Sequence, residues 1–434
     1  MIDGSHVGRR RFLVALAAAA LTAPSLLARG ARRASAHSAR HWAAVQAMVD
    51  GYVADGKVAG AGVAVSYGGT AVAYRVAGRI ALDSPERFDE NSLCRIYSMT
   101  KPVTGAAAMI LVEEGKLGLD QPVTDVLPEF RSLRVATDIQ KGLESRPAVK
   151  TMTMRHLLTH TSGLSYWTPL SGVGVLPTAY RERGITPGNY GTGLSRPGYG
   201  PQARSLAEMV ARVADLPLAC EPGTGWNYSI GLDVMGLVIE RVTGKGFDVF
   251  LRERLFEPLD MSSTGFQVAP RNAARLTTNY NVTTDGLKPG DTGAASVWLR
   301  PPTLLAGGGG LVSTARDFAR FGTMLLGDGA LRRVRIMKPE TARLGRSNLL
   351  PAGVVHPSGG GFGAGARVVL PGGDGRFGPV GSFGWGGAAG TVWWIDPARQ
   401  GNVVFMTQFM PPDSYPVRDQ ISAAIEADLE VRQE

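Results

Sequence analysis

The chain has 434 residues, of which 44% are hydrophobic and 19% charged, a balance typical of a folded globular protein. It carries 46 basic and 37 acidic side chains, but residues 1–36 hold six arginines and one aspartate, so the remainder has 40 basic and 36 acidic side chains and a net charge of +4. That balance does not indicate a nucleic-acid-binding protein, and roughly 400 residues are enough for one large domain or two lobes.

The N-terminus has the pattern of an export signal. Arg9 and Arg10 precede an apolar run that ends at Leu27 and is too short for a comfortable membrane span. Residues 34–36 (Ala-Ser-Ala) offer a small-x-small cleavage site. The twin arginine resembles a Tat-type signal. We therefore expect removal of residues 1–36, export to the periplasm or beyond, and no membrane span in the mature protein.

A helix and then a β-hairpin are predicted next. Apolar residues recur at helical spacing over residues 38–55. Residues 61–66 and 72–77 are typical of two strands, and the turn between them contains Gly68 and Gly69.

Ser98 stands three residues before Lys101, at the start of an apolar stretch over residues 102–119. Positions i and i+3 share a face of a helix, so Lys101 is placed beside the Ser98 hydroxyl. A serine hydroxyl is a poor nucleophile until a neighbouring base takes its proton. The spacing therefore predicts a nucleophile and a base, although a helix start with a solvent-facing lysine would give the same pattern.

The middle of the chain, residues 95–300, is predicted to be mainly helical with long loops. Residues 168–203 are rich in Gly and Pro and show no clear periodicity, which indicates a loop that shapes a cleft. His156 and His160 share a helical face, but no glutamate follows the first histidine as in zinc proteases. We expect these histidines to fix a loop by hydrogen bonds.

Tyr228 follows a turn-forming segment and precedes the apolar run 232–242. A tyrosine at such a loop-to-helix junction can point its hydroxyl into a cleft, or it can be an ordinary half-buried tyrosine. Cys94 and Cys220 are predicted to be small buried side chains rather than a disulfide, and no C-x-x-C zinc pattern is present.

The C-terminal part is predicted to contain strands and a closing helix. Residues 384–390 include four glycines, beginning with Gly384-Trp385-Gly386-Gly387, and the β-branched and aromatic residues 391–395 follow as a strand. Residues 403–407 are typical of an adjacent antiparallel strand, residues 364–370 of a further strand, and residues 420–431 of a helix.

Taken in order, the serine-lysine pair, the tyrosine and the glycine-flanked edge strand resemble the serine β-lactamase and penicillin-binding protein superfamily. The similarity is greatest to the class C-like branch that includes family VIII carboxylesterases. It spans residues 43–427 and includes the runs 153–164 and 307–317. The resemblance implies an α/β (α+β) fold for residues 37–434, with an antiparallel sheet flanked by helices and a helical subdomain inserted within residues 95–300.

The resemblance also implies a mechanism. Ser98 would be the nucleophile, and Lys101 and Tyr228 would act as a coupled pair that takes its proton. The backbone N–H groups of Ser98 and Ala388 would form the oxyanion hole. Neither a metal nor an organic cofactor is implied. An α/β-hydrolase is excluded because no serine has glycines at the G-x-S-x-G spacing.

Two departures from the family pattern bear on the substrate. Ile230 stands where class C β-lactamases and DD-peptidases have asparagine, and Trp385-Gly386-Gly387 replaces K-T-G. We expect Trp385, Gly386, Gly387 and Ile230 to line the substrate site, and the lost charge to favour uncharged esters. The expected activity is that of a serine carboxylesterase acting on a small-molecule ester.

Four alternatives stay open from the sequence. They are an acyltransferase, an amide or oligomer hydrolase of the same branch, a β-lactamase, and a penicillin- or peptidoglycan-binding protein without turnover. The oligomeric state stays open as well.

Overall fold

The structure is a computed structural model that describes residues 42–169, 172–186 and 197–431. The predicted signal segment, residues 1–36, lies outside these described residues. None of the helices in the described part of the chain is long and apolar enough to cross a membrane.

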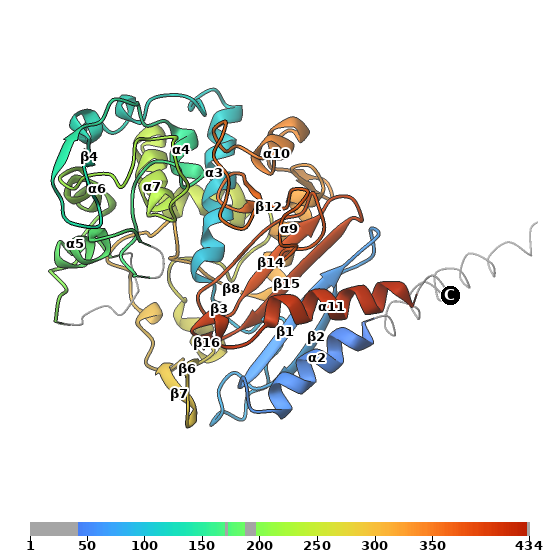
Figure 1. The fold of residues 1–434 in the computed structure, drawn as a ribbon. Coiled ribbons are helices and arrows are strands. Elements are labelled where there is room, and N and C mark those ends of the chain that lie inside the picture. The colour runs from blue at the N-terminus through green and yellow to red at the C-terminus, as the bar shows by residue number, and fades with distance from the viewer. Residues whose placement is uncertain (1–41, 170–171, 187–196, 432–434) are drawn as a thin grey trace, which may run out of the picture.

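The centre of the fold is a seven-stranded antiparallel sheet (Figure 1). In spatial order its strands are β11 (Gly361–Phe362), β12 (Arg367–Val368), β13 (Phe383–Gly386), β14 (Val392–Asp396), β15 (Gly401–Thr407), β1 (Gly60–Ser66) and β2 (Ala73–Gly78). Strands from the two ends of the chain meet at the β15–β1 pair, where Val63 lies opposite Phe405. The predicted hairpin and the predicted pair of C-terminal strands are both confirmed.

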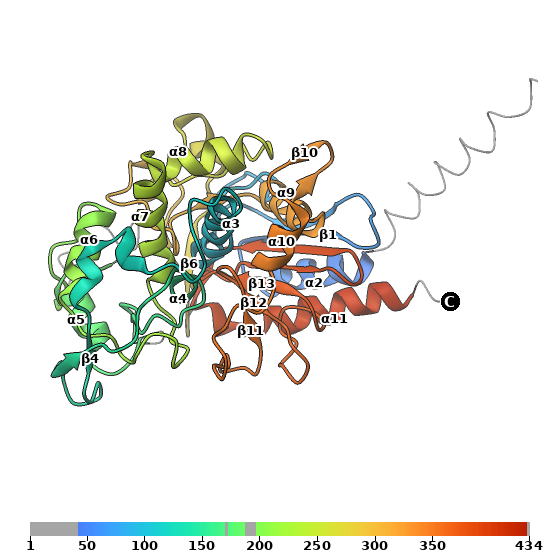
Figure 2. The ribbon, with the colours of Figure 1, turned by 90° about the horizontal axis from the view of Figure 1, so that it is seen from above.

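Two helices cover one face of this sheet. They are α2 (Ala43–Ala54) and α11 (Val417–Glu430), which pack together along the N- and C-terminal strands (Figures 1 and 2). The Asp428 carboxylate accepts hydrogen bonds from the backbone N–H groups of Ala44 and Val45. Because these N–H groups lie in the first turn of α2, they have no partner within the helix, and the carboxylate ties the two helices together.

Helices on the other face form the main core with the sheet (Figure 2). They are α3 (Thr100–Glu113), α9 (Ala315–Leu326) and α10 (Pro339–Gly345). Helix α9 begins at Thr314, whose side chain accepts from the Asp317 backbone N–H. Its Phe318 and Phe321 rings pack against Trp393 of β14.

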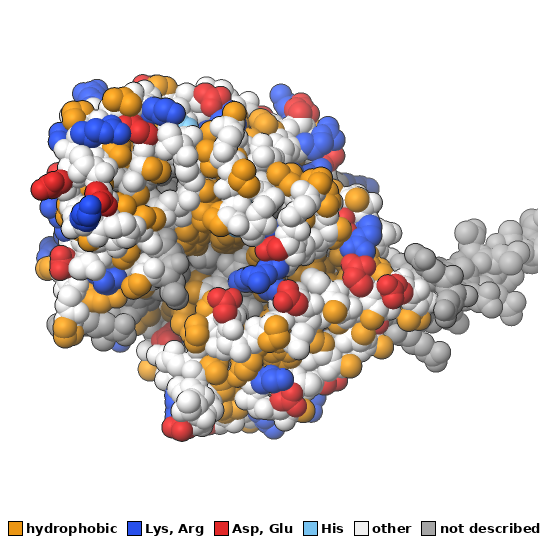
Figure 3. Space-filling view, in the orientation of Figure 1, with side chains coloured by type: hydrophobic (Ala, Val, Ile, Leu, Met, Phe, Trp, Pro, Cys, Tyr) orange, Lys and Arg blue, Asp and Glu red, His pale blue; other side chains and the backbone are white. Residues whose placement is uncertain are grey.

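A separate group of helices stands beside the sheet, next to α3. These helices are α4 (Met154–Leu158), α5 (Leu176–Glu182), α6 (Leu206–Ala214), α7 (Gly231–Thr243) and α8 (Phe247–Leu251). Helix α7 packs directly on α3. Figure 3 shows a hollow on the surface between this group and the sheet. The arrangement confirms the predicted α/β fold with an antiparallel sheet and flanking helices.

Two parts of the fold differ from the prediction. The segment 168–203 contains α5, which forms because Leu176 and Tyr180 are buried and the Tyr180 hydroxyl accepts from the Ser165 backbone N–H. Of the segment predicted as a strand over 364–370, only β12 is a strand.

The remaining strands form small ribbons. They are β3 (Cys94–Arg95) with β8 (Val312–Ser313), β4 (Arg134–Ala136) with β5 (Ser145–Pro147), β9 (Ala330–Leu331) with β10 (Val334–Arg335), and β6 (Asn279–Thr283) between β7 (Gly286–Asp291) and β16 (Phe409–Met410).

Candidate active site

The predicted nucleophile lies where a short 3-10 turn, residues 97–99, runs into α3. Ser98 is half-buried, whereas Lys101, in the first turn of α3, is fully buried. The Lys101 Nζ donates to Ser98 Oγ at 3.3 Å, as the i, i+3 spacing predicted. The N-terminus of α3 points toward the serine, so its dipole favours negative charge there.

Tyr228 comes to the same place from the loop before α7. Its hydroxyl shares a hydrogen bond of 2.7 Å with Ser98 Oγ. The Lys101 Nζ lies 4.5 Å from the centre of the Tyr228 ring, a cation–π distance. The structure therefore brings together Ser98, Lys101 and Tyr228, the three side chains that the sequence predicts to be catalytic. Ser98 and Tyr228 are 130 residues apart in the sequence.

The Lys101 ammonium is held by groups that the sequence analysis did not identify. It donates to the Gly308 carbonyl oxygen at 2.6 Å and lies 5.6 Å from the Tyr166 ring centre. The Gly308 backbone N–H in turn donates to Asp233 Oδ1 at 2.9 Å. A Cβ at position 308 would stand 2.5 Å from Asp233 Oδ2, so only glycine fits there.

Asp233 is fully buried in the first turn of α7, and its Oδ2 has no hydrogen-bond partner among the described residues. Burial raises the pKa of Asp233 to about 6, although the charge of Lys101 acts to lower it. An acidic residue inside the apolar run 232–239 was the signal that could have identified it.

His160 holds the Tyr228 loop in place. Its Nδ1 accepts from the Ser229 backbone N–H at 3.1 Å, and its ring lies 4.6 Å from the Tyr228 ring, centre to centre. Burial holds the pKa of His160 well below its usual value, with the charge of Lys101 acting in the same direction, so the ring is neutral. His156 Nδ1 accepts from the Thr153 N–H. The prediction that these histidines fix loops is confirmed.

The glycine-flanked strand is β13, and it forms the wall of the site opposite α3. Trp385 stacks on Tyr228, with ring centres 6.0 Å apart, and also on Phe377. A Cβ on Gly387 would overlap the carbonyl oxygen of Ile96, so the absence of a side chain lets the turn after β13 lie against the segment before Ser98.

Ala388, the predicted oxyanion donor, follows in that turn. Its backbone N–H donates to no group in the described part of the chain. Ser98 lies in the first turn of its 3-10 helix, where backbone N–H groups have no intrahelical partner. Both N–H groups are thus available to an incoming oxygen.

Ile230 does not line the substrate site, so the prediction for this residue is wrong. Its side chain is fully buried in the main core, and its backbone N–H donates to the Ser165 carbonyl. It precedes α7 directly and turns inward because an isoleucine gains more from burial than from facing a polar cleft. Cys94 and Cys220 are both free thiols. Within the described residues, no group of three or more His, Cys, Asp or Glu side chains could hold a metal ion.

The antiparallel sheet with its flanking helices, and the joined serine, lysine and tyrosine, define a protein of the serine β-lactamase and penicillin-binding protein superfamily. The chain belongs to the Beta-lactamase family, whose model matches residues 45–427.

Relatives with known names are similar over most of the chain. Protein Rv1367c from Mycobacterium tuberculosis is 36% identical over 344 residues, which cover 76% of this chain and 80% of the relative. Esterase EstB from Burkholderia gladioli is 32% identical over 386 residues, covering 84% of this chain and 90% of the esterase. The solved structure of EstCE1, a hydrolase with promiscuous acyltransferase activity, matches with a TM-score of 0.72 at 25% identity and covers 88% of this chain and 97% of its own.

Proposed function

We propose that this protein is a serine carboxylesterase, similar to the family VIII esterases, that forms an acyl-enzyme on Ser98. The observation that carries the proposal is the 2.7 Å hydrogen bond between Ser98 Oγ and Tyr228 Oη, with Lys101 Nζ at 3.3 Å from the same oxygen. A hydroxyl with two possible proton acceptors in reach is an activated nucleophile. The name of Esterase EstB supports hydrolysis of esters, and EstCE1 is described as a hydrolase.

To accept a proton, the Tyr228–Lys101 pair must start with one vacant proton site, either as a tyrosinate beside the Lys101 ammonium or as a Tyr228 hydroxyl beside a neutral amine. In the acylation step, Ser98 Oγ attacks the ester carbonyl carbon while its proton passes to this site. The carbonyl oxygen becomes an oxyanion that accepts hydrogen bonds from the N–H groups of Ser98 and Ala388. A donor of this kind is worth roughly 3–4 kcal/mol in the transition state. The tetrahedral intermediate then expels the alcohol, which takes the proton from the pair.

In deacylation a water molecule attacks the acyl carbonyl carbon and gives its proton to the same pair. The pair passes this proton to Ser98 Oγ as the bond between Oγ and the acyl carbon breaks, which releases the acid and restores the serine hydroxyl. If an alcohol replaced the water, the same steps would transfer the acyl group. Acyl transfer is the second candidate function, and the description of EstCE1 favours it. The two functions are distinguished by the product ratio when a short alcohol is added to an ester assay.

The test is a panel of short- and long-chain 4-nitrophenyl esters beside a chromogenic cephalosporin. We expect esters to be hydrolysed far faster than the cephalosporin, since Trp385 gives β13 an aromatic wall instead of a cation. Ser98→Ala should abolish turnover, and an organophosphonate should label Ser98. The matched control is Ser347→Ala, at an exposed serine. Equal turnover in a folded Ser98→Ala variant would refute the proposal.

We also propose that the protein is exported through its twin-arginine segment, which is supported by Arg9, Arg10 and the short apolar run that follows. The mature chain should begin near His37. Replacing Arg9 and Arg10 by lysine should retain the precursor in the cytoplasm, and unchanged export in a host without the Tat pathway would contradict this.

A further inference from the structure

A buried carboxylate is separated from the Lys101 ammonium by a single glycine residue. Asp233 Oδ1 accepts from the Gly308 backbone N–H at 2.9 Å, and the Gly308 carbonyl oxygen accepts from Lys101 Nζ at 2.6 Å. Both side chains are fully buried. A negative and a positive group are therefore bonded to the same residue, in a place where water does not screen them from each other.

The glycine between the two groups is held from both sides. From α3, Lys101 donates to the Gly308 carbonyl, and the Thr104 hydroxyl donates to the Gly307 carbonyl oxygen at 2.7 Å. From α7, the Asp233 carboxylate lies so close that a Cβ on Gly308 would stand 2.5 Å from its Oδ2. Because the segment is packed against both helices, the carboxylate and the ammonium are kept at a fixed separation.

The dipole of α7 alone does not explain a carboxylate at this place. Asp233 lies in the first turn of α7, where negative charge is favoured. An exposed carboxylate gains the same benefit and keeps its water, as Asp248 does in the first turn of α8. Asp233 is instead fully buried, and its Oδ2 has no hydrogen-bond partner among the described residues. A charge buried in this way requires a partner of opposite sign.

Lys101 is that partner. Its charge acts to lower the pKa of Asp233, against the larger effect of burial. Within the described residues Lys101 forms no direct ion pair, and its hydrogen bonds go to Ser98 Oγ and to the Gly308 carbonyl oxygen. The other titratable side chains that the ammonium contacts or acts on are aromatic: Tyr166, Tyr228 and His160.

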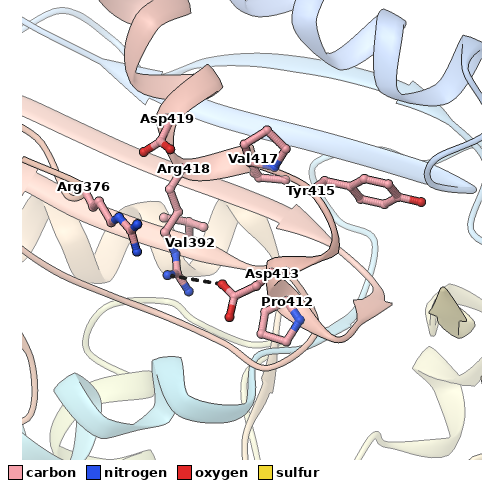
Figure 4. A pocket seen from close by; sticks show the side chains of 10 residues that line it. Arg376, Val392, Pro412, Asp413, Tyr415, Val417, Arg418 and Asp419 are labelled. Atoms are coloured by element: carbon pink, nitrogen blue, oxygen red, sulfur yellow. Dashed lines mark ion pairs between the residues drawn. The ribbon is translucent and has the colours of Figure 1, made fainter. Parts of the chain in front are cut away.

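The remaining charges near α7 and β13 do not act on Asp233. Helices α3, α4, α6 and α8 pack on α7, and apart from Lys101 their titratable side chains do not contribute to the pKa of Asp233. These side chains are Glu113, Arg155, His156, Glu208, Arg212 and Asp248. A cavity of about 330 Å³ where α11 begins has charges of its own, including an ion pair of 4.0 Å between Arg418 and Asp413 (Figure 4). They do not contribute to the pKa of Asp233 either.

We propose that Asp233 is a positioning residue for catalysis, whose carboxylate stabilises the Lys101 ammonium across Gly308 and so leaves the vacant proton site of the pair on Tyr228. Tyr228 Oη is the atom that shares the 2.7 Å hydrogen bond with Ser98 Oγ, so it receives the serine proton directly. Asp233 neither gives nor takes a proton during turnover. This inference rests on the proposed esterase function and names one of the two forms of the pair as the reactive one.

The test compares the pH dependence of kcat/KM for 4-nitrophenyl butyrate between wild type and Asp233→Asn. Asparagine keeps an oxygen for the Gly308 N–H but carries no charge. Because burial raises the pKa of Asp233 to about 6, the wild-type carboxyl is itself neutral well below that pH. We therefore expect the ratio of wild-type to variant kcat/KM to be near one at about pH 4.5. It should rise through pH 6 to about ten at pH 8, a coupling usual within one hydrogen-bond network. The loss should lie in kcat rather than in KM, since Asp233 touches no substrate.

Asp317→Asn is the matched control. Asp317 is also a buried carboxylate in the first turn of a helix, α9, and burial raises its pKa as well. It accepts from the Ser263 N–H and the Thr264 hydroxyl, which lie outside the active site. The ratio for this control should not change with pH. A ratio for Asp233→Asn that is equal at pH 4.5 and pH 8 would overturn the inference, because a merely structural role lowers activity at both.

A second measurement identifies the proton site. Tyr228→Phe removes that site and should lower kcat about a hundredfold or more in the wild type. The same change should cost less in the Asp233→Asn background, where the Lys101 amine can hold the vacancy instead. An equal cost in the two backgrounds would show that Asp233 does not decide where the vacant site lies, and would overturn the inference.

Failure of the wild type to hydrolyse any ester would count against the esterase function alone. The inference is then tested by the rate at which an organophosphonate labels Ser98, which needs the same proton acceptor but no turnover. The same pH-dependent ratio should appear in this rate, and a constant ratio, or no labelling of wild-type Ser98, would overturn the inference. If Asp233→Asn fails to fold, Asp233→Ser, which also removes the charge, must show the same pH dependence.

Discussion

Asp233→Asn should make the protein more stable at neutral pH. The carboxyl of Asp233 is fully buried, one of its oxygens has no partner among the described residues, and burial raises its pKa from 3.8 to about 6. Asparagine has the shape of the protonated carboxyl. In the wild type the Gly308 N–H donates to Asp233 Oδ1, and the amide oxygen of asparagine can accept the same hydrogen bond. The substitution therefore removes the buried charge and keeps the hydrogen bond.

The magnitude follows from the two pKa values. One pKa unit corresponds to 1.36 kcal/mol, so the difference between 3.8 and about 6 is worth roughly 3 kcal/mol. Between these values the folded protein binds the proton more tightly than the unfolded chain. The contribution of Asp233 to the free energy of unfolding is therefore fully present below about pH 4 and is lost as the pH rises through about 6.

The assay is urea unfolding of wild type and variant at pH 4, 5, 6 and 7. Three histidines change the stability of both proteins over this range, because burial lowers the pKa of His156 and His356 to about 4 and holds that of His160 well below its usual value. Their effect has the opposite sign, since stability rises as they lose protons in the unfolded chain. It cancels in the difference between the two proteins.

We expect the Asn variant to equal the wild type near pH 4 and to exceed it by up to about 3 kcal/mol at pH 7. Asp419→Asn, at an exposed aspartate, is the control and should show no such pH-dependent gain. A difference between Asp233→Asn and wild type that stays constant from pH 4 to pH 7 would refute the reasoning.

Three further predictions concern catalysis. Lys101→Ala and Tyr228→Phe should each lower kcat about a hundredfold or more in a 4-nitrophenyl ester assay, and the double variant should be far from additive because the two share one proton path; multiplicative losses would contradict this. Gly308→Ala should lower kcat with little change in KM, because its Cβ would meet Asp233 Oδ2 and displace the carbonyl that holds Lys101; unchanged kcat would show that this carbonyl is not needed. Trp385→Ala should raise KM more than it lowers kcat, and a pure kcat effect would place Trp385 in the proton path instead.

Much of the fold was predictable because its signals are local. The hairpin of β1 and β2 follows from two apolar runs around paired glycines, and β14 from a run of β-branched and aromatic residues. The β6–β7 ribbon was not predicted, because Asn279–Thr283 is largely polar. That segment is a strand through pairing with β7 and with β16, more than 100 residues away.

The residues of the site also fall into two groups: those that the sequence predicts and those that only long-range contacts bring into place. Ser98 and Lys101 are recognisable because three residues of helix bring them together, and Tyr228 is recognisable through family resemblance. Gly308 and His160 act through contacts with Lys101 and with the Tyr228 loop that no spacing in the sequence encodes. The prediction for Ile230 failed because the place of a residue in a motif does not determine the direction of its side chain. Burial in the core decides where that side chain points.

The backbone at the nucleophile shows why long-range contacts matter to the chemistry. Tyr97 has φ of 41°, in the left-handed region that tyrosine rarely adopts, at a cost of roughly 1–3 kcal/mol. The Trp298 ring packs edge-on against Tyr97, and the Asn279 side chain contacts its hydroxyl. Asn279 and Trp298 lie about 180 to 200 positions further along the chain. Because they hold Tyr97 in a buried position, the turn that follows directs the Ser98 side chain toward Tyr228. The S-x-x-K spacing places the lysine beside the serine, but the distant segments fix the direction of the serine itself.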